Sequence, residues 1–208
     1  MVSDPWVLAT RNPGKLRELR LLFATNGIGV IDLDEAGVPE DHVTEEAIES
    51  FDTFEENALA KARHFSQLLP GRRVLADDSG LVVDALGGEP GVRSKRWSGR
   101  TGVGGAEIDA ANNAHLRARM MAVGVRSARF VCAAAYCDGR TEVVAIGEVL
   151  GRIEDEGRGV HGFGYDPFFH VAELGCTLAE ATLEQKQLVS HRGRAFVALC
   201  DRLGVRVV

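Results

Sequence analysis

Disulfide pairs, membrane spans and a secretion signal are all absent from the pattern of this sequence. Its 208 residues include four cysteines with no C-x-x-C pair, which predicts a reduced, cytoplasmic protein. No apolar run approaches the roughly 20 residues that a transmembrane helix needs, and the amino-terminal stretch lacks a signal-peptide pattern. We therefore expect no membrane partner.

An excess of positive charge is lacking as well. The formal net charge is −6, which argues against a nucleic-acid partner, so any phosphate ligand must be met by local cations or by a metal. Apolar residues make up 45% of the chain and charged residues 26%, as in globular proteins with a sizeable core. With no internal repeat or low-complexity linker, we expect a single domain over residues 1–208, with room for two lobes.

Apolar periodicity predicts a mixed α/β sheet with an early β-α-β order and a later antiparallel hairpin at Asp138-Gly139. An acidic loop is expected after the second strand, and Asp52 or Thr53 is expected to cap the next helix, with Glu55 or Glu56 closing the cap. The strands are expected at 7–9, 28–31, 74–76, 130–136 and 143–149, and the helices at 16–27, 54–69, 106–121, 178–188 and 194–203.

The first candidate site is the turn from Thr10 to Lys15, between a buried strand and a helix. Backbone N–H groups at a helix start, with the Lys15 cation beside them, attract phosphate. The turn is not a Walker loop, because G-x-x-x-x-G-K-[ST] is absent. Taken alone, the stretch fits an ordinary connection with a solvated lysine equally well.

The second candidate site is A-D-D-S-G, residues 76–80, where a strand is expected to end. Alternation along a strand sends the side chains of Asp77 and Asp78 to opposite faces, so only one of them reaches a ligand. Strand ends in α/β sheets are common ligand sites, whereas the same four letters often form a tight turn.

The third candidate site is G-F-G-Y-D-P, residues 162–167. Its glycines permit a close backbone approach, and Phe163 and Tyr165 offer flat faces on which a base could stack. The alternative is a glycine-proline turn with two core aromatics.

The fourth candidate site is K-Q-L-V-S-H-R-G, residues 186–193, with Ser190 as a helix cap. Lys186, His191 and Arg192 combine a point charge, an imidazole and a planar guanidinium within one short segment. A solvated basic face is the alternative. Together, the four sites offer groups for phosphate, carboxylates for Mg²⁺ and a stacking surface for a base, which indicates a metal-dependent nucleotide hydrolase.

In their order, the motifs T-x-N-x-G-K, T-F-x-E-N-A-x-x-K-A, A-D-D-S-G-L, F-G-Y-D-P and S-H-R-G resemble the Ham1/RdgB family of non-canonical purine NTP pyrophosphatases. The resemblance runs from Val7 to Arg194. It implies hydrolysis of ITP, dITP and XTP to the monophosphate and pyrophosphate, with Mg²⁺, by a cytoplasmic homodimer. The fold it implies is ITPase-like: an elongated mixed sheet flanked by helices, with two lobes and the active site in the cleft between them.

Carried over residue by residue, the resemblance makes Asp78 the catalytic carboxylate and Asp78 and Glu49 the metal ligands. The substrate-binding positions it implies are Thr10, Arg11, Asn12, Pro13, Gly14, Lys15, Ser79, Phe163, Gly164, Tyr165, Asp166, Lys186, His191 and Arg192.

The chain departs from the family pattern at three places. Arg11 replaces a usual glycine, residues 94–99 read S-K-R-W-S-G instead of S-A-R-Y-S-G, and residues 49–54 read E-S-F-D-T-F instead of E-x-T-G-x-T-F. The last change leaves Glu45 and Glu46 as alternatives to Glu49 as the second metal ligand.

Two rival functions follow from the same residues. A Maf-type nucleotide pyrophosphatase shares the fold and reaction but favours other bases, and the motif set argues against it. A non-catalytic nucleotide sensor would bind the triphosphate without turnover, which the retention of Asp78 disfavours. The expected reaction is attack of water at the α-phosphorus, in which Asp78 either holds the metal or accepts the proton.

Overall fold

A seven-stranded sheet forms the framework, in the order β2-β1-β3-β4-β5-β6-β7. The structure is a computed structural model in which residues 4–207 are described, apart from the side chains of His42 and Glu46. The strands are β1 Trp6–Leu8, β2 Val30–Asp32, β3 Val74–Val83, β4 Ser127–Cys137, β5 Glu142–Ile153, β6 Phe169–Val171 and β7 Cys176–Thr177. Because β1 pairs in parallel with β2 and β3 while β5, β6 and β7 pair antiparallel, the predicted mixed sheet is confirmed.

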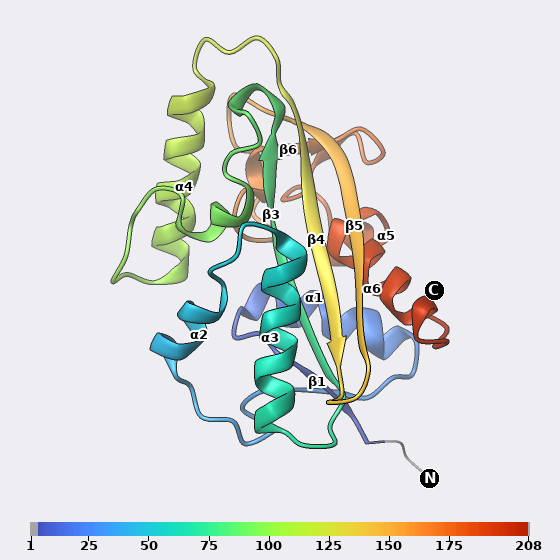
Figure 1. Cartoon of the computed structure of the whole chain (residues 1–208). Helices are drawn as coiled ribbons and strands as arrows, with labels where there is room; N and C mark the ends of the chain where they lie inside the picture. Colours follow the sequence, from blue (N-terminus) through green and yellow to red (C-terminus); the bar gives the residue numbers. More distant parts are fainter. Residues whose placement is uncertain (1–3, 208) are drawn as a thin grey trace. The chain divides into compact units, whose positions relative to one another are not determined.

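Six α-helices and three 3₁₀-helices accompany the sheet in the described part of the chain (Figure 1). They are α1 Pro13–Thr25, α2 His42–Ile48, α3 Phe54–Leu68, α4 Gly105–Met120, α5 Leu183–Val189, α6 His191–Arg202, η1 Asp84–Leu86, η2 Gly91–Arg96 and η3 Asp166–Phe168. Among residues 4–207, no helix is long and apolar enough to cross a membrane.

Capping residues set where several helices begin. Thr53 caps α3, with its hydroxyl accepting from the Glu56 N–H at 3.2 Å, so Thr53 and Glu56 are the residues chosen from the predicted alternatives. Thr182 forms a full capping box with Gln185, which is why α5 begins at Leu183 and not near 178. The segment predicted as an acidic loop contains α2, whose first turn is capped by the Asp41 carboxylate.

Strand β3 is longer than predicted. The expected end at the two aspartates is wrong, because β3 continues through Asp77, Asp78, Ser79 and Gly80 to Val83. All but one of its residues are buried, as expected of a central strand covered on both faces. The two carboxylates therefore sit in the middle of a strand.

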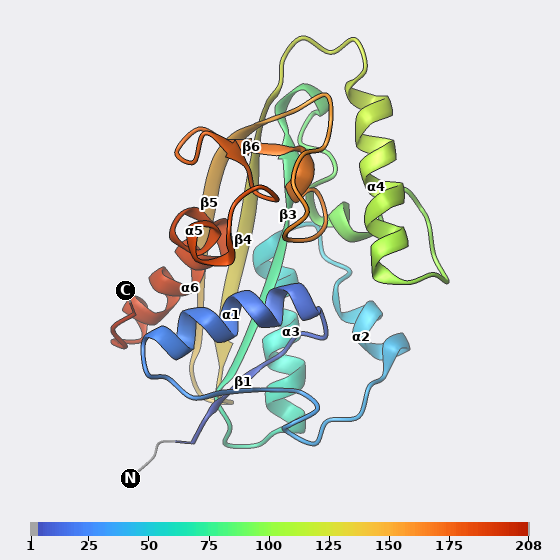
Figure 2. The same ribbon diagram turned by 180° about the vertical axis from the view of Figure 1, so that it is seen from behind.

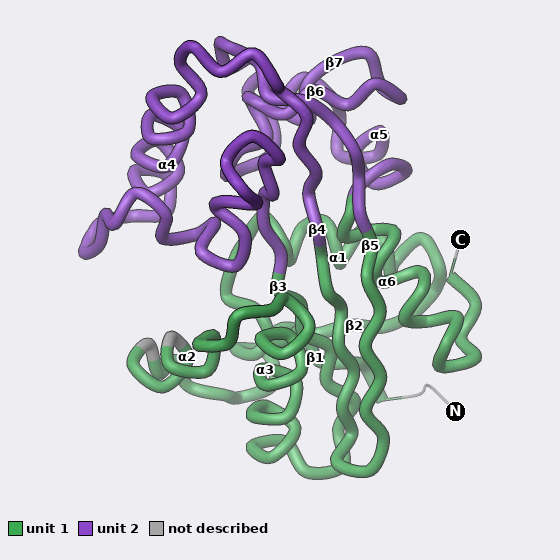
Figure 3. Tube along the Cα trace, turned by 45° about the horizontal axis from the view of Figure 1, so that its top comes forward, with its two compact units in different colours: residues 1–78, 132–147, 191–208 green, residues 79–131, 148–190 purple. Residues whose placement is uncertain are grey.

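The chain divides into two compact units, coloured separately in Figure 3. The first unit holds the described residues up to 78 together with 132–147 and the described residues from 191 on; the second holds 79–131 and 148–190. Because β3, β4 and β5 contribute residues to both units, neither unit is a continuous piece of chain. The predicted cleft between two lobes stays a prediction.

Each unit has its own hydrophobic core. In the first unit, α1 and α6 lie on one face of the strands and α3 lies on the other (Figures 1 and 2). Trp6, Phe23 and Phe196 pack between the sheet and the α1–α6 pair, with Phe23 and Phe196 in edge-to-face contact. In the second unit, Leu116 of α4 joins Leu81 of β3 and their neighbours in a separate cluster.

Candidate functional site

Asp77 and Asp78 point to opposite faces of β3. Leu75 of the same strand belongs to the core beneath α1 and α6, and alternation places Asp77 on that face and Asp78 on the α3 face. The contacts agree with this alternation, because Asp77 is bound by side chains from α1 and α6, whereas Asp78 accepts a hydrogen bond from Asn57 of α3.

Asp77 is a buried anion in an ion-pair network of the first unit. Its Oδ2 atom lies 3.0 Å from Lys15 Nζ and 3.1 Å from Arg192 Nε, and Arg192 also pairs with Glu18. Burial opposes ionisation of Asp77, but the charges of Lys15 and Arg192 outweigh it and hold the pKa of Asp77 well below its ordinary value. Asp77 therefore stays charged and anchors the two cations.

Asp78 sits in a different electrostatic environment. Its Oδ2 atom accepts from Asn57 Nδ2 at 3.1 Å, and burial raises the pKa of Asp78 although Lys15 and Lys61 act against that rise. The negative charge of Glu49 raises the pKa of Asp78 further, so the two carboxylates act on each other electrostatically.

Lys61 contacts both β3 and Glu49. Its ammonium donates to the backbone oxygen of Asp77 at 2.9 Å and pairs with the Glu49 carboxylate. Two carboxylates with mutual repulsion, one of them desolvated, suit a hard divalent cation that takes oxygen ligands. Within the described residues, no group of three or more acids, histidines or cysteines could hold a metal. Water or substrate oxygens would have to supply the remaining ligands.

The structure bears on the alternatives to Glu49. Glu45 Oε1 accepts from Arg11 Nη2 at 3.1 Å, so the Glu45 carboxylate is engaged in an ion pair with Arg11. Arg11 also donates to the backbone oxygens of Val38 and Pro39, both at 3.1 Å. The side chain of Glu46 lies outside the described residues. The negative charge of Glu49, in contrast, acts directly on Asp78 and raises its pKa.

The turn from Thr10 to Lys15 is closed by its own side chains. Asn12 Oδ1 accepts from the N–H groups of Gly14 and Lys15 at 2.8 and 3.0 Å, and Pro13 opens α1. The Thr10 hydroxyl in turn accepts from the Asn12 N–H at 3.2 Å. Because Asn12 occupies two of the helix-end amides, the Lys15 ammonium is the group of this turn best suited to meet an anion.

In the second unit, residues 163–166 form a compact polar loop. Asp166 Oδ2 accepts from the Phe163 N–H at 2.9 Å and pairs with the buried ammonium of Lys186. That ammonium stands 5.0 Å from the centre of the Phe163 ring, in cation–π geometry. Gly162 is required here, because a Cβ at that position would lie 2.1 Å from Asp166 Oδ2 and its φ is +75°.

The two aromatics of this loop have different surroundings. The Phe163 ring is partly exposed, whereas Tyr165 is 4% exposed and its hydroxyl donates to the Ser94 backbone oxygen at 2.8 Å. Of the two predicted stacking faces, Phe163 alone remains a candidate, because the ring of Tyr165 packs in the core.

The predicted site residues thus fall into two groups, each described within its own unit. The first unit contains Thr10, Arg11, Asn12, Pro13, Gly14, Lys15, Glu49, Asp78, His191 and Arg192, and the second contains Ser79, Phe163, Gly164, Tyr165, Asp166 and Lys186. Arg11 is the outlier of the first group, because its guanidinium binds residues of the 34–45 segment. His191 and Arg192 open α6, and both are buried.

Sequence reasoning missed several partners of these residues. Asn57 and Lys61 stand four residues apart on α3, so helical periodicity within E-N-A-x-x-K-A could have placed both on the face toward β3. Glu18 is one turn beyond Lys15 on α1 and could have been found in the same way. Asp109 and Asn113 of α4, which bind the Gly164 backbone, carried no comparable signal.

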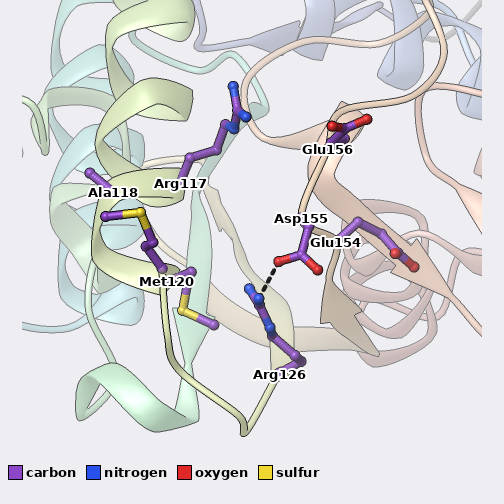
Figure 4. Close-up of a pocket in the computed structure, with 8 residues that line it drawn as sticks. Arg117, Ala118, Met120, Arg126, Glu154, Asp155 and Glu156 are labelled. Atoms are coloured by element: carbon purple, nitrogen blue, oxygen red, sulfur yellow. Dashed lines mark hydrogen bonds and ion pairs between the residues drawn. The ribbon is translucent and has the colours of Figure 1, made fainter.

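The second unit also carries a surface hollow. It measures about 430 Å³ and is lined by Arg117, Ala118, Met120, Met121, Arg126, Glu154, Asp155 and Glu156 (Figure 4). Arg126 pairs with Asp155 across it, so much of its charge is internally balanced. None of the predicted residues is among the described residues that line it.

Comparisons with known proteins place this geometry in context. The model of the Ham1 family matches residues 6–202. The chain is 47% identical over 201 residues to a dITP/XTP pyrophosphatase of Burkholderia pseudomallei, covering 95% of this chain and 92% of the relative. It is 48% identical over 202 residues to a dITP/XTP pyrophosphatase of Bordetella parapertussis, covering 95% and 90%.

Solved structures agree with these matches. The Ham1 protein of Staphylococcus aureus is similar with a TM-score of 0.78 and 35% identity, over 97% of this chain and 98% of that one. A nucleoside-triphosphatase or dITP/XTP pyrophosphatase from Mycobacterium abscessus is similar with a TM-score of 0.70 and 42% identity, over 96% and 99%. The mixed α/β architecture is therefore shared with these proteins.

Proposed function

The chain belongs to the Ham1 family, and we propose that it carries out the reaction for which its relatives are named. It is a nucleoside triphosphate pyrophosphatase that hydrolyses non-canonical purine nucleotides such as ITP, dITP and XTP to the monophosphate and pyrophosphate. This activity removes the unwanted nucleotides from the pool.

Carboxylates and cations gather around β3 in the first unit, and this combination is the observation that carries the proposal. Lys15 and Lys61 both act on Asp78, and Glu49 lies in the same electrostatic environment. A triphosphate needs cations for its oxygens, and its hydrolysis needs an anionic group to hold a metal or to accept a proton. We assign the phosphate chain to this group of residues.

Asp78 and Glu49 are the proposed metal ligands, and Mg²⁺ is the proposed metal. The donor set fits, because Mg²⁺ commonly binds through one or two carboxylates together with substrate phosphates. When bound, the ion would neutralise charge on the phosphate oxygens. The raised pKa of Asp78 is consistent with a carboxylate that is incompletely compensated until a cation binds.

In the proposed reaction, water attacks the α-phosphorus and pyrophosphate leaves. Asp78 binds the metal or accepts the proton of the attacking water, and Lys15 stabilises charge on the departing pyrophosphate. Asp77 serves as the anchor of Lys15 and Arg192, because its carboxylate binds both cations. The carboxylate of Asp77 is therefore a positioning group in this scheme.

The base belongs to the loop of residues 163–166 in the second unit. The partly exposed Phe163 ring supplies a stacking face, and the Lys186 ammonium beside it is a hydrogen-bond donor. Inosine and xanthine present a 6-oxo acceptor where adenine presents an amino donor. A donor at that position would be left unpaired by adenine, and such mismatches discriminate strongly.

A homodimer working in the cytoplasm completes the proposal. Twofold dimers are the commonest assemblies of soluble enzymes. The four cysteines are all free thiols, three of them buried, which suits a reducing compartment.

The test is pyrophosphate release from a panel of purine and pyrimidine triphosphates, with and without Mg²⁺. We expect Mg²⁺-dependent pyrophosphate from ITP, dITP and XTP, and much slower release from ATP. Preference for pyrimidine triphosphates would favour the Maf-type reaction, and tight ITP binding without turnover would favour a nucleotide sensor.

A further inference from the structure

Two side chains of α4 hold the backbone of Gly164 on both of its sides. Asp109 Oδ2 accepts from the Gly164 N–H at 2.8 Å, and Asn113 Nδ2 donates to the Gly164 carbonyl oxygen at 2.9 Å. The two residues stand one helical turn apart, so they present a matched acceptor and donor from one face of the helix. Gly164 adopts a φ of +61°, and both neighbouring peptides are thereby fixed in a conformation that favours glycine.

These contacts bear directly on the Phe163 ring. The peptide between Phe163 and Gly164 is fixed by Asp109, and the N–H of Phe163 itself is fixed by Asp166. The ring then lies beneath the ammonium of Lys186. With the backbone pinned before and after Phe163, the direction of its Cα–Cβ bond is set, and the contact with the Lys186 ammonium favours one rotation of the ring.

Asn113 is a poor choice for packing alone. Its Oδ1 atom is buried and has no hydrogen-bond partner among the described residues, which lowers stability. Reversing the amide would set that oxygen against the Gly164 carbonyl oxygen, so the donor must face the loop. The hydrogen bond from the Asn113 amino group to Gly164 is therefore kept although the amide oxygen of Asn113 has no such bond.

We propose that Asp109 and Asn113 are positioning residues for base binding, which orient the Phe163 ring by fixing the Gly164 backbone. This inference rests on the proposed function of the 163–166 loop. It deepens that function, because a base-binding ring is useful only when its orientation is set before the nucleotide arrives.

The experiment compares Asp109→Ala, Asn113→Ala and Asp109→Asn in steady-state hydrolysis of ITP. We expect each alanine variant to raise KM about tenfold while kcat stays within about twofold, because uniform binding is lost. Asp109→Asn keeps an acceptor oxygen, so its KM should stay within about threefold of that of the wild type. Glu107→Ala is the matched control, since Glu107 lies exposed on the same helix with a weak contact to Arg100.

Combination with Phe163→Ala separates positioning from a general effect on the fold. If Asp109 acts through the ring, Asp109→Ala should raise KM no further in the Phe163→Ala background. A second rise by the same factor would overturn the proposal, as would alanine variants with the KM of Glu107→Ala. Absence of pyrophosphate release by the wild type would instead refute the proposed function, so the two failures are distinguishable.

Discussion

The two aspartates of β3 should respond differently to exchange for asparagine: Asp77→Asn should lower the stability of the fold, whereas Asp78→Asn should preserve or raise it. Asp77→Asn removes the anion that Lys15 and Arg192 share, and it leaves the buried Arg192 with one anionic partner fewer. Asp78→Asn removes a charge whose burial is poorly compensated, as the raised pKa of Asp78 indicates. An acid with a raised folded-state pKa is destabilising as an anion at neutral pH, so the neutral amide relieves that penalty.

The size of the first effect follows from the network. Removal of one partner of a buried ion pair costs about 3–5 kcal/mol, and because Arg192 keeps Glu18 we expect the lower end, about 3 kcal/mol. At about 2–4 °C per kcal/mol for a chain of this size, Asp77→Asn should lower Tm by roughly 6–12 °C. Asp78→Asn should keep the wild-type Tm or exceed it.

The effects of the two variants on activity should be the reverse of their effects on stability. Loss of a general base costs about 10²–10⁴-fold in kcat, and loss of a metal ligand would add to that, so Asp78→Asn should be nearly inactive although stable. Asp77→Asn should lose less kcat when it is assayed below its lowered Tm. Thermal unfolding and ITP turnover of both variants decide the matter. An unchanged Tm for Asp77→Asn, or near-normal turnover by Asp78→Asn, would refute the reasoning.

Four further outcomes are expected. Phe163→Ala should raise KM for ITP about 5- to 150-fold, since stacking of a base on an aromatic ring is worth about 1–3 kcal/mol; an unchanged KM would make the ring a packing residue. Tyr165→Phe removes the hydrogen bond to the Ser94 backbone oxygen and should lower the free energy of unfolding by about 1 kcal/mol, as measured by denaturant unfolding. An unaltered KM for ITP in the same variant would confirm that the role of Tyr165 is structural. The folded-state pKa of Asp77 is depressed below its ordinary 3.8, so the stability that its charge contributes is present above about pH 4 and is lost as the pH falls toward the folded-state pKa. The difference in Tm between wild type and Asp77→Asn should therefore narrow only below about pH 4. A difference in Tm that already narrows near about pH 6 would contradict this assignment. Sedimentation should give a species of about twice 22.4 kDa at micromolar concentration, whereas a 22.4 kDa species alone would rule out the proposed dimer.

Local rules in the sequence predicted much of the fold. Hydrophobic periodicity located α1 and α3, because each has an apolar face of the helical period, and the Asp138-Gly139 turn signal located the β4–β5 hairpin. The same rules misplaced elements that depend on non-local contacts. Strand β3 continues past two aspartates because Lys15, Arg192 and Asn57 bind their carboxylates, and no window of the sequence shows those partners.

The sequence predicted the individual residues of the candidate site but not which side chains bind one another. Alternation along a strand correctly separated Asp77 from Asp78. It could not indicate that Arg192, far along the chain, would bind Asp77, or that Arg11 would bind Glu45. Such pairings depend on tertiary structure that brings distant segments together, so motif spacing alone does not reveal them.

Hydrolysis of ITP in ¹⁸O-labelled water, followed by mass spectrometry of the products, tests the central claim most directly. Attack at the α-phosphorus predicts one labelled oxygen in the inosine monophosphate and unlabelled pyrophosphate, with the reaction dependent on Mg²⁺. Label in orthophosphate, formed together with inosine diphosphate, would contradict the account.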